Sequence, residues 1–460
     1  MGHNALMMMF RAILVFLFAL LLPLQAMAQS AGLSVVRDSE IEFALREWCT
    51  PIWQAAGLNP DAIKIILVNS PDVNAFVAGG SNIFIYTGLI NATRSPGELL
   101  GVIAHETGHI AGGHLIQGRQ AMERASYESI LATMLGIGAA ASGAGDAAKA
   151  LVIGGNGLAM SGFLAHTRVQ EASADQAALS YLEKAPYNPT GLVSFLNTMK
   201  NQELLPQSQQ DQYLRTHPLT SDRLDAMISG SRKSKNLALP YSTDMVERYM
   251  RIKAKISGFM TPQRVVWDYS EKDTSTSAIY ARAIAAYRQS DKAKAIKLID
   301  QLIAQEKDNP WFYEVKGQML RDFGDLQGAL TAYRKTVALE PKSALTRIDL
   351  AQVLIEMPGG PSKENYAEAE KNLDLARQLE QKSMAIHRMY ATMYGRMGDE
   401  PQAKYHLAEE ATLRGDTKEA RRLLEAAMPG LKAGTPALRQ ANDLKVYLDA
   451  QPKKDDSDRH

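Results

Sequence analysis

The chain has 460 residues, of which 46% are hydrophobic and 22% are charged, and its formal net charge is +1. This composition is typical of a folded globular protein, and the length predicts two or three domains. A charge so close to neutral gives no electrostatic reason to expect binding to nucleic acid. The single cysteine, Cys49, excludes an internal disulfide, and we expect it to be a small buried residue.

The N-terminal segment has the features of a secretory signal peptide. Arg11 precedes an apolar run at residues 12–24, and Ala26 and Ala28 follow in the small-x-small arrangement that a signal peptidase reads. The run is shorter than the roughly 20 apolar residues that a membrane-spanning helix needs. We therefore expect residues 1–28 to be cleaved on export. The near absence of cysteine then favours the bacterial periplasm over a disulfide-rich secreted protein.

The first folded elements are predicted to be a helix, several strands and a second helix. Apolar residues recur on one helical face over residues 38–56. Three stretches rich in β-branched and aromatic residues predict strands at residues 63–70, 73–80 and 82–88. Ser95 followed by Pro96 predicts the N-cap and the first turn of the next helix.

The second predicted helix carries a candidate metal site. His105, Glu106 and His109 form the pattern HExxH. Residues four apart lie about 40° apart around a helix, so both imidazoles point to one side. Glu106 is offset by about 100°, which lets it approach a water molecule rather than the metal. Two neutral imidazoles suit Zn²⁺, and the carboxylate can take the proton of the water.

His114 is a third histidine close to this motif. A metzincin would need its third histidine at position 115, where this chain has Leu115. Five residues along a helix from His109 is a rotation of about 140°, so the helical geometry predicts that His114 faces away from the site. We expect it to be a half-exposed helical histidine or to help hold the helix end.

The third metal ligand is predicted to come from a later segment. Residues 168–182 read as a helix in which Glu171 and Asp175 are four residues apart. This spacing lets Glu171 reach the metal while Asp175 accepts a hydrogen bond from the ring N–H of a ligand histidine. Two acids on a solvated helix face are a common alternative, but the HExxH motif upstream favours the metal site.

Two stretches, at residues 129–145 and 150–165, carry no charged residue, and each is too short to span a membrane. We favour a helical hairpin packed on the core. The alternative is that residues 129–165 make peripheral contact with a membrane or with an unfolded client protein. The polar residues 201–212 read as a mobile loop.

The C-terminal half is helical and periodic. The segments beginning at Ser290 and Gly324 match position for position at a spacing of 34 residues, and a later match at 40 residues indicates a short insertion near residues 357–365. A period of 34 with Gly-Asp turns is the tetratricopeptide signature, and the concave face of such repeats usually binds a peptide or a partner protein. We place this helical domain at residues 241–450, followed by a disordered tail at residues 451–460.

The motifs together resemble the M48 family of zinc metallopeptidases. The resemblance rests on five phrases: "AHETGH" and "EASAD" at the metal site, "NAFVAGG" and "NIFIYTGLI" before it, and "THPLTSDR" after it. It implies an α+β zincin-like (gluzincin) domain at residues 29–240, followed by an all-α tetratricopeptide-repeat solenoid. The chain differs from family members that have spanning helices, because it has no apolar segment of that length.

The resemblance also implies roles for individual residues. One Zn²⁺ per chain is expected to be held by His105, His109 and Glu171, with Glu106 as the general base. His217 is expected to take the fourth coordination position from a plug loop that keeps the enzyme shut, although "THP" before a helix is equally the sequence of a simple turn. Arg223 is expected to stabilise the oxyanion or to hold the plug. His166 is expected to be structural, or a minor partner behind the ligands.

The substrate is expected to add as an extended strand to a sheet edge formed by Asn74, Ala75, Phe76, Val77 and Ala78. The architecture is similar to that of periplasmic family members that act on outer-membrane proteins. It implies hydrolysis of misfolded or stalled outer-membrane proteins, with repeats that bind the client or a barrel-assembly complex. The alternative is a chaperone or assembly scaffold whose protease is largely latent.

Overall fold

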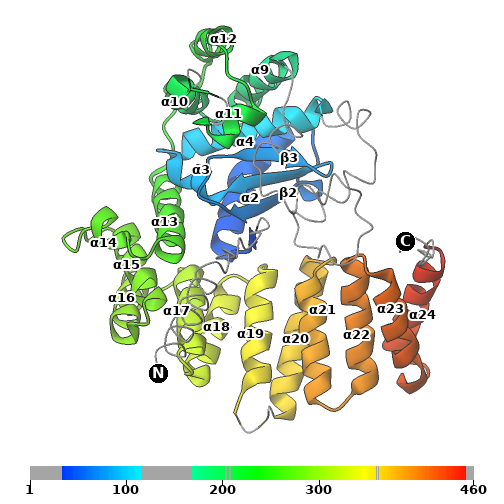
Figure 1. Cartoon of the computed structure of the whole chain (residues 1–460). Coiled ribbons are helices and arrows are strands. Elements are labelled where there is room, and N and C mark those ends of the chain that lie inside the picture. Colours follow the sequence, from blue (N-terminus) through cyan, green and yellow to red (C-terminus); the bar gives the residue numbers. More distant parts are fainter. Residues whose placement is uncertain are drawn as a thin grey trace, which may run out of the picture.

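In a computed structural model, the described residues are 34–114, 168–202, 205–206, 209–358, 360 and 362–451. Outside these residues lie the predicted signal peptide, the two charge-free stretches at residues 129–145 and 150–165, His166 and the tail beyond residue 451. The described chain has two parts: a small sheet covered by helices, and a row of paired helices that runs below it (Figure 1). This α+β domain followed by an all-α solenoid is the predicted fold class. Within the described residues, no helix is both long enough and apolar enough to cross a membrane.

The sheet has four strands in the order β1-β2-β4-β3. β2 (Lys64–Asn69), β3 (Ala75–Ala78) and β4 (Asn82–Tyr86) confirm the three predicted strands, while β1 (Ser34–Val36) was not predicted. β2 and β4 are parallel, and β3 pairs antiparallel with β4, with Phe76 opposite Phe84. β3 therefore lies at the edge of the sheet, as the substrate-binding prediction requires.

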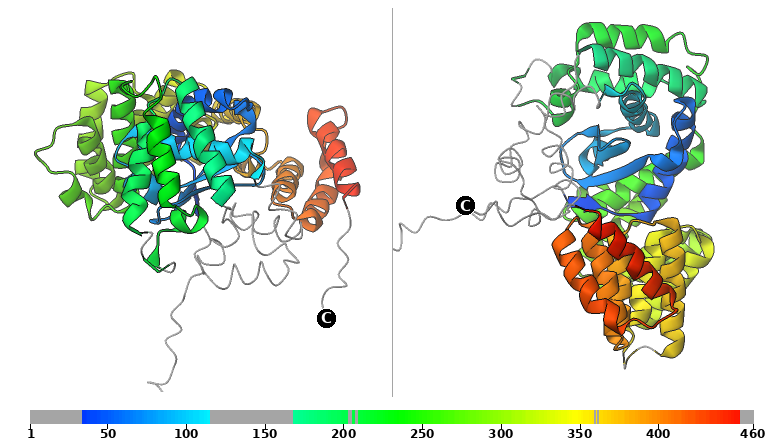
Figure 2. Two further views of the ribbon diagram at one scale, coloured as in Figure 1. Left: turned by 90° about the horizontal axis from the view of Figure 1, so that it is seen from above. Right: turned by 90° about the vertical axis from the view of Figure 1, so that its right-hand side faces the viewer.

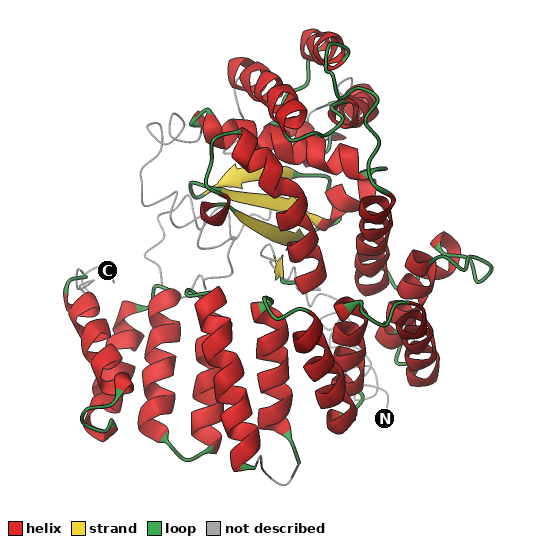
Figure 3. Cartoon of the chain, turned by 180° about the vertical axis from the view of Figure 1, so that it is seen from behind, coloured by secondary structure: helices red, strands yellow, loops and turns green. Residues whose placement is uncertain are grey.

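Helix α2 (Ser39–Ala55) confirms the first predicted helix and begins at the N-cap Asp38, whose carboxylate accepts from the amide of Ile41. Its apolar face buries Trp48 and Trp53 in the core of the first part of the chain, and Cys49 is buried as expected. Short helix α3 (Thr87–Ala92) follows β4 directly. The views in Figure 3 and in the right panel of Figure 2 show the sheet flanked by helices.

Helix α4 (Pro96–Ala111) crosses the centre of this part of the chain. The side chain of Ser95 accepts from the amide of Glu98, so the predicted N-cap is confirmed. α4 packs against α9 (Arg168–Lys184) and α10 (Thr190–Met199). A Cβ added at Gly108 would lie 2.9 Å from the backbone of Ala174, so α4 and α9 approach each other as closely as a glycine allows.

The polar segment at residues 201–212, predicted as a mobile loop, contains helical residues at both of its ends. Residues 200–202 form a 3-10 turn, and α11 (Gln212–Thr216) is a short helix, followed by α12 (Ser221–Ser231). Residues 203–204 and 207–208 lie outside the described part of the chain.

The C-terminal part begins with α13 (Thr243–Met260) and α14 (Val265–Asp268), and helix pairs follow them. The pairs are α15 (Thr276–Arg288) with α16 (Lys292–Gln305), α17 (Pro310–Asp322) with α18 (Leu326–Leu339), α19 (Ala344–Glu356) with α20 (Lys363–Leu379), α21 (Met384–Arg396) with α22 (Glu400–Leu413), and α23 (Thr417–Ala427) with α24 (Pro436–Asp449). The first helices begin at 276, 310, 344, 384 and 417, so the spacings are 34, 34, 40 and 33. The third spacing contains the predicted insertion.

The Gly-Asp turns work as the repeat pattern predicts. Gly324 and Gly398 have φ of +82° and +77°, a left-handed conformation that a glycine adopts without strain and that ends a helix. Asp325 and Asp399 then cap the next helix with their carboxylates. Gly317 lies against the ring of Tyr333, where an added Cβ would approach to 2.9 Å, so the two helices of this repeat pack closely.

The two parts of the chain meet at the first turn of α2. Nζ of Lys255 on α13 lies 2.8 Å from Oδ2 of Asp38, and Nε of Arg251 lies 2.5 Å from Oε1 of Glu40. The hydroxyl of Tyr280 on α15 donates to Glu40 at 3.0 Å. α13 belongs to both parts, because other residues of this helix join the core of the first part: Tyr249, Ile252 and Ile256.

Candidate metal centre

The HExxH motif lies near the C-terminal end of α4, where the helix is buried on all sides. His105, Glu106 and His109 each have no exposed surface. His105 and His109 lie one turn apart, and their Nε2 atoms are 3.1 Å from each other. The helical spacing therefore points both imidazoles at one position, as the sequence predicts.

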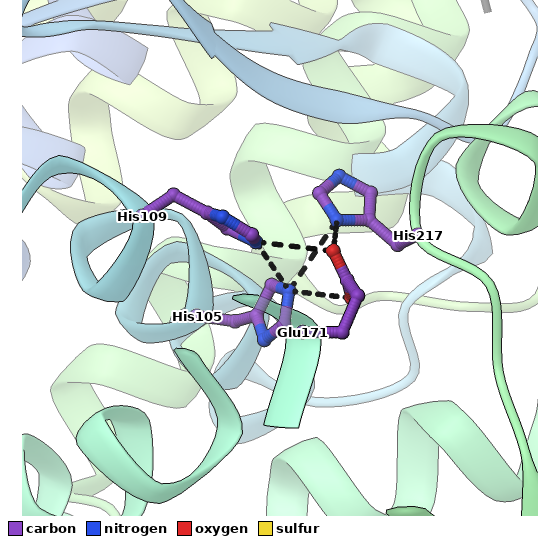
Figure 4. A group of neighbouring side chains, drawn as sticks. All are labelled: His105, His109, Glu171 and His217. Carbon is purple, nitrogen blue, oxygen red and sulfur yellow. Dashed lines mark hydrogen bonds and ion pairs between the residues drawn. The ribbon is translucent and has the colours of Figure 1, made fainter. Parts of the chain in front are cut away.

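Glu171 reaches the same position from α9. Its Oε2 lies 3.3 Å from Nε2 of His105, and its Oε1 lies 3.3 Å from Nε2 of His109. Figure 4 shows the carboxylate facing the two imidazoles. The close approach of α4 and α9 at Gly108 is what brings this acid within reach across more than 60 residues of sequence.

His217 completes the group from the residue after α11. Its Nδ1 lies 3.0 Å from Oε1 of Glu171 and 3.4 Å from Nε2 of His105. One candidate ligand atom from each of the four residues lies within 4.8 Å of the other three, and all four residues are buried (Figure 4). Three imidazole nitrogens and one carboxylate oxygen are donors that Zn²⁺ prefers, so the group fits one zinc ion.

Two further predicted residues lie directly behind the ligands. Oδ1 of Asp175 is 2.9 Å from Nδ1 of His105, the nitrogen on the outer side of that ring. Arg223 lies 2.8 Å from Asp175 through Nε and 2.8 Å from Oε2 of Glu171 through Nη1. The same Nη1 donates to the carbonyl of Pro218 at 2.5 Å. Arg223 therefore links the acids of α9 to the residue immediately after His217.

Comparison with known proteins agrees with this geometry. Residues 36–229, which contain every residue of the group, match peptidase family M48. This part of the chain is an M48 peptidase domain.

Several known proteins are similar in sequence to parts of this chain. The beta-barrel assembly-enhancing protease of Yersinia pestis is 25% identical over 307 residues, which cover 63% of this chain and 60% of that protein. The protein of the same name from Escherichia coli strain K12 is 25% identical over 260 residues, covering 54% of this chain and 52% of that protein. The metalloprotease LoiP of the same organism is 27% identical over 203 residues, 43% of this chain and 75% of that protein. The chain thus matches about half to three fifths of the two assembly-enhancing proteases.

Burial and neighbouring charges shift the pKa values of the two acids of the site, Glu106 and Glu171. Burial raises the pKa of Glu106 to about 7, although the charges of His217 and His105 oppose this rise. Burial also acts to raise the pKa of Glu171, but His217 and His105 outweigh it and hold that pKa well below its usual value. Glu171 is therefore a carboxylate at neutral pH, and Glu106 titrates near neutrality, where a general base is most effective.

The unsatisfied polar atoms of the M48 domain also fit a metal site. Both carboxylate oxygens of Glu106 are buried without a hydrogen-bond partner among the described residues. The nearest ring nitrogen to Glu106 is Nε2 of His217, at 3.4 Å. Buried carboxylate oxygens without a partner are costly, so their clustering beside three imidazoles is the pattern expected of residues that serve a cation and its water.

The prediction that His114 is half-exposed and faces away from the site was wrong, whereas the alternative that it helps hold the helix end stays a prediction. His114 is only 6% exposed, and its Nδ1 lies 3.0 Å from Nδ1 of His109, so it faces the site instead of turning away. The helical rotation does not apply because α4 ends at Ala111. Gly113 has φ of +62°, which reverses the chain and returns the imidazole to the helix.

The predicted substrate edge is a sheet edge, but it is covered in this structure. The segment 74–78 is buried, with each residue at most 3% exposed. The amide of Tyr213 donates to the carbonyl of Val73 at 3.0 Å, and Nε2 of His217 lies 3.2 Å from the carbonyl of Ala75. The segment that carries His217 therefore occupies the edge of β3 next to the metal site.

Tyr213 belongs to the site but was not predicted from the sequence. Its ring stacks on that of His217 at 4.7 Å between centroids, with 28° between the planes. Its hydroxyl is buried and has no hydrogen-bond partner among the described residues. The spacing of four residues before His217 places the two rings on one side of a helical turn, and this signal was available in the sequence.

Proposed function

We propose that the chain is a zinc-dependent endopeptidase of the bacterial periplasm that is held shut by its own plug. One observation carries the proposal: the side chains of His105, His109 and Glu171 converge on one buried position, and Glu106 lies beside it. An accidental HExxH pattern has no reason to meet a carboxylate from a distant helix in a fully buried cluster of polar side chains.

Each residue has a separate role in the proposed reaction. His105, His109 and Glu171 would hold the zinc ion, which when bound polarises a carbonyl group and lowers the pKa of water to about 7. Glu106 removes a proton from the attacking water and returns it to the leaving amine, and its raised pKa suits both transfers. Asp175 orients His105 through Nδ1, and Arg223 positions Asp175 and Glu171.

His217 would act as the plug. It is within 3.0 Å of Glu171 and within 3.4 Å of Glu106, and so takes the space beside the base where a water and a scissile carbonyl would have to bind. The segment 213–217 also uses the carbonyls of Val73 and Ala75, which an extended substrate added to β3 would need. Opening of this segment would expose the metal and the edge strand together.

The repeats would recruit proteins to the peptidase. We propose a peptidase domain at residues 29–240 after a signal peptide at residues 1–28, and a repeat domain at residues 241–450 that binds a client or a barrel-assembly complex. Two relatives are named beta-barrel assembly-enhancing proteases, which supports misfolded or stalled outer-membrane proteins as the substrate class. We propose no nucleic-acid partner, in keeping with the net charge of +1.

A second candidate function is an assembly scaffold or chaperone whose protease is largely latent. The closed arrangement favours it, because His217 is 1% exposed and the catalytic group lies entirely below the surface. In such a protein the helix pairs would bind the client, and peptide cleavage would occur only after the plug moves.

A comparison of Glu106→Gln with the wild type tests the two functions. The wild type and the variant are incubated with an unfolded outer-membrane protein, and a deletion strain that carries each is scored for outer-membrane assembly. Loss of cleavage together with loss of rescue supports the protease, whereas loss of cleavage with full rescue supports the scaffold. Glu183→Gln, at the far end of α9, is the matched control. If neither the wild type nor His217→Ala cleaves the client, the proposed function is wrong.

A further inference from the structure

The two histidines of HExxH have the same arrangement around their rings. In both, Nε2 faces the metal position: Nε2 of His105 lies 3.3 Å from Oε2 of Glu171, and Nε2 of His109 lies 3.3 Å from Oε1. In both, Nδ1 points outward to a buried polar partner. For His105 this partner is Asp175, at 2.9 Å, and for His109 it is Nδ1 of His114, at 3.0 Å.

We propose that His114 is a positioning residue that fixes the ring of His109 for metal binding, as Asp175 does for His105. The inference rests on the proposed zinc site. A histidine that offers the lone pair of Nε2 to a metal carries its proton on Nδ1. Nδ1–H of His109 then donates to Nδ1 of His114. This assignment places the proton of His114 on its own Nε2.

The backbone after α4 is built to deliver this imidazole. The helix ends at Ala111, Gly112 is its C-cap, and Gly113 takes a φ of +62° that returns the chain toward the helix. A Cβ at position 112 would lie 2.5 Å from Nε2 of His114 and 2.9 Å from its Cδ2 and Cε1. The glycine therefore leaves the space in which the ring of His114 lies.

The geometry of the two rings also fits a hydrogen bond, not a stack. The ring planes of His109 and His114 are 76° apart, and their centroids are separated by 5.0 Å. The 3.0 Å between the two Nδ1 atoms is a normal hydrogen-bond length. His114 is 6% exposed, so water does not readily replace it as the partner of His109.

Zinc affinity tests the proposal directly, because a partner behind a ligand histidine typically changes metal affinity by about 10–100-fold. The dissociation constant for Zn²⁺ is measured by competition with a chelator in the wild type, in His114→Leu and in His114→Asn. Leucine fills the space without an acceptor. Asparagine keeps an acceptor oxygen in the place of Nδ1. We expect His114→Leu to weaken zinc binding by about 10–100-fold and His114→Asn to restore most of the affinity.

Two further measurements keep the test decisive. Gly112→Ala leaves His114 in the sequence but puts a methyl group into the space of its ring, and it should also weaken zinc binding. Far-UV circular dichroism of each variant reports folding, and the visible spectrum of the Co²⁺ form reports the ligand geometry. If His114→Leu folds badly, the proposal is tested by comparing the zinc affinities of His114→Asn and Gly112→Ala. The proposal predicts tighter zinc binding by His114→Asn than by Gly112→Ala, and equal affinities would contradict it.

The outcomes separate this inference from the proposed function. If the wild type binds no stoichiometric zinc, the proposed function fails and this inference fails with it. If the wild type binds zinc and cleaves protein, but His114→Leu binds zinc within about twofold of the wild type, this inference alone is wrong. Equal losses in His114→Leu and His114→Asn would also overturn it, because packing rather than a hydrogen bond would then be the role of His114.

Discussion

The ring of Tyr213 stacks on the ring of His217, with 4.7 Å between their centroids. The ring of His217, which we propose closes the metal site, therefore packs against an aromatic surface. Tyr213 is itself anchored, because its amide donates to the carbonyl of Val73 and its ring packs edge-on against Phe195 at 5.1 Å. The proposed plug therefore includes a pair of stacked rings fixed to the sheet edge and to α10.

Loss of the Tyr213 ring should open the plug. We expect Tyr213→Ala to raise the rate of cleavage of an unfolded protein severalfold over the wild type, because His217 loses its stacking partner and leaves the site more often. His217→Ala should raise it at least as much. The measurement is the initial rate on a fluorogenic unfolded substrate at equal zinc occupancy.

Tyr213→Phe is the matched control for the ring. The hydroxyl of Tyr213 is buried without a partner among the described residues, so its removal should keep the plug closed and leave cleavage at the wild-type rate. It should stabilise the protein by up to about 1–3 kcal/mol, since an unsatisfied buried hydroxyl is lost. Faster cleavage by Tyr213→Phe than by the wild type would show that the hydroxyl, not the stack, holds the plug.

Gly108 should control the distance between the ligands. An added methyl group would meet the backbone of Ala174 at 2.9 Å, and so would push α9, with Glu171, away from α4. We expect Gly108→Ala to destabilise the domain by about 1–3 kcal/mol and to weaken zinc binding. Thermal unfolding and chelator competition measure the two effects.

Gly395→Ala is the control for a helical glycine without such a contact. A Cβ there would have no neighbour within 4 Å, so alanine should stabilise α21 by about 0.5–1 kcal/mol without changing zinc affinity. Unchanged zinc binding in Gly108→Ala would contradict the role of this glycine in bringing Glu171 to the site.

Much of this arrangement could be predicted because it depends on short-range patterns. Ser95 before Pro96 predicts the start of a helix, and the four-residue spacing in HExxH places two side chains on one helix face. The period of 34 residues predicts a repeated pair of helices. The metal site combined two such patterns, HExxH and the Glu171–Asp175 pair. The sequence placed each of these patterns on a helix, and the contact between α4 and α9 was inferred because HExxH needs a third ligand from another segment.

Where prediction from the sequence failed, the missing information was tertiary. The position of His114 depends on a left-handed glycine that ends the helix, which a helical projection cannot include. β1 has three residues, too few for a pattern. The edge at Asn74–Ala78 was predicted as a strand, but the segment that covers it lies more than 130 residues later.

Lys255 should be essential for joining the two parts of the chain. It is 2% exposed and lies within 3.4 Å of three acids, Asp38, Glu40 and Glu314. Removal of one member of a buried charge cluster leaves the others uncompensated, so Lys255→Met should destabilise the protein by about 3–5 kcal/mol. Lys316→Met removes a more exposed ion pair with Asp300 and should lower the free energy of unfolding by at most about 1 kcal/mol. Urea unfolding compares the two; equal effects would contradict the prediction.

The same cluster predicts a pH dependence of stability. Burial raises the pKa of Glu314 to about 8. The positive charge of Lys255 opposes this rise only in part, because Lys255 also forms ion pairs with Asp38 and Glu40. The other ionisable groups whose charges act on Glu314 include Asp349. Between the ordinary value of 4.5 and about 8, folded Glu314 keeps a proton that the unfolded chain releases. The free energy of unfolding should therefore fall as the pH rises through this window.

Glu314→Gln isolates this effect, because glutamine resembles the protonated acid at every pH. Its unfolding free energy should decline less than that of the wild type between about pH 6.5 and pH 8. That range lies above the pKa of Asp349, which burial raises to about 6. Parallel curves for the two proteins in urea unfolding would exclude a protonated Glu314 in the folded state.

The zinc content of the purified, full-length protein tests the central claim most directly. We predict one zinc ion per chain in the wild type, and a loss of nearly all of it in Glu171→Ala at unchanged far-UV circular dichroism. A folded wild-type protein that holds no stoichiometric zinc after exposure to the ion would contradict the claim, whatever activity it showed.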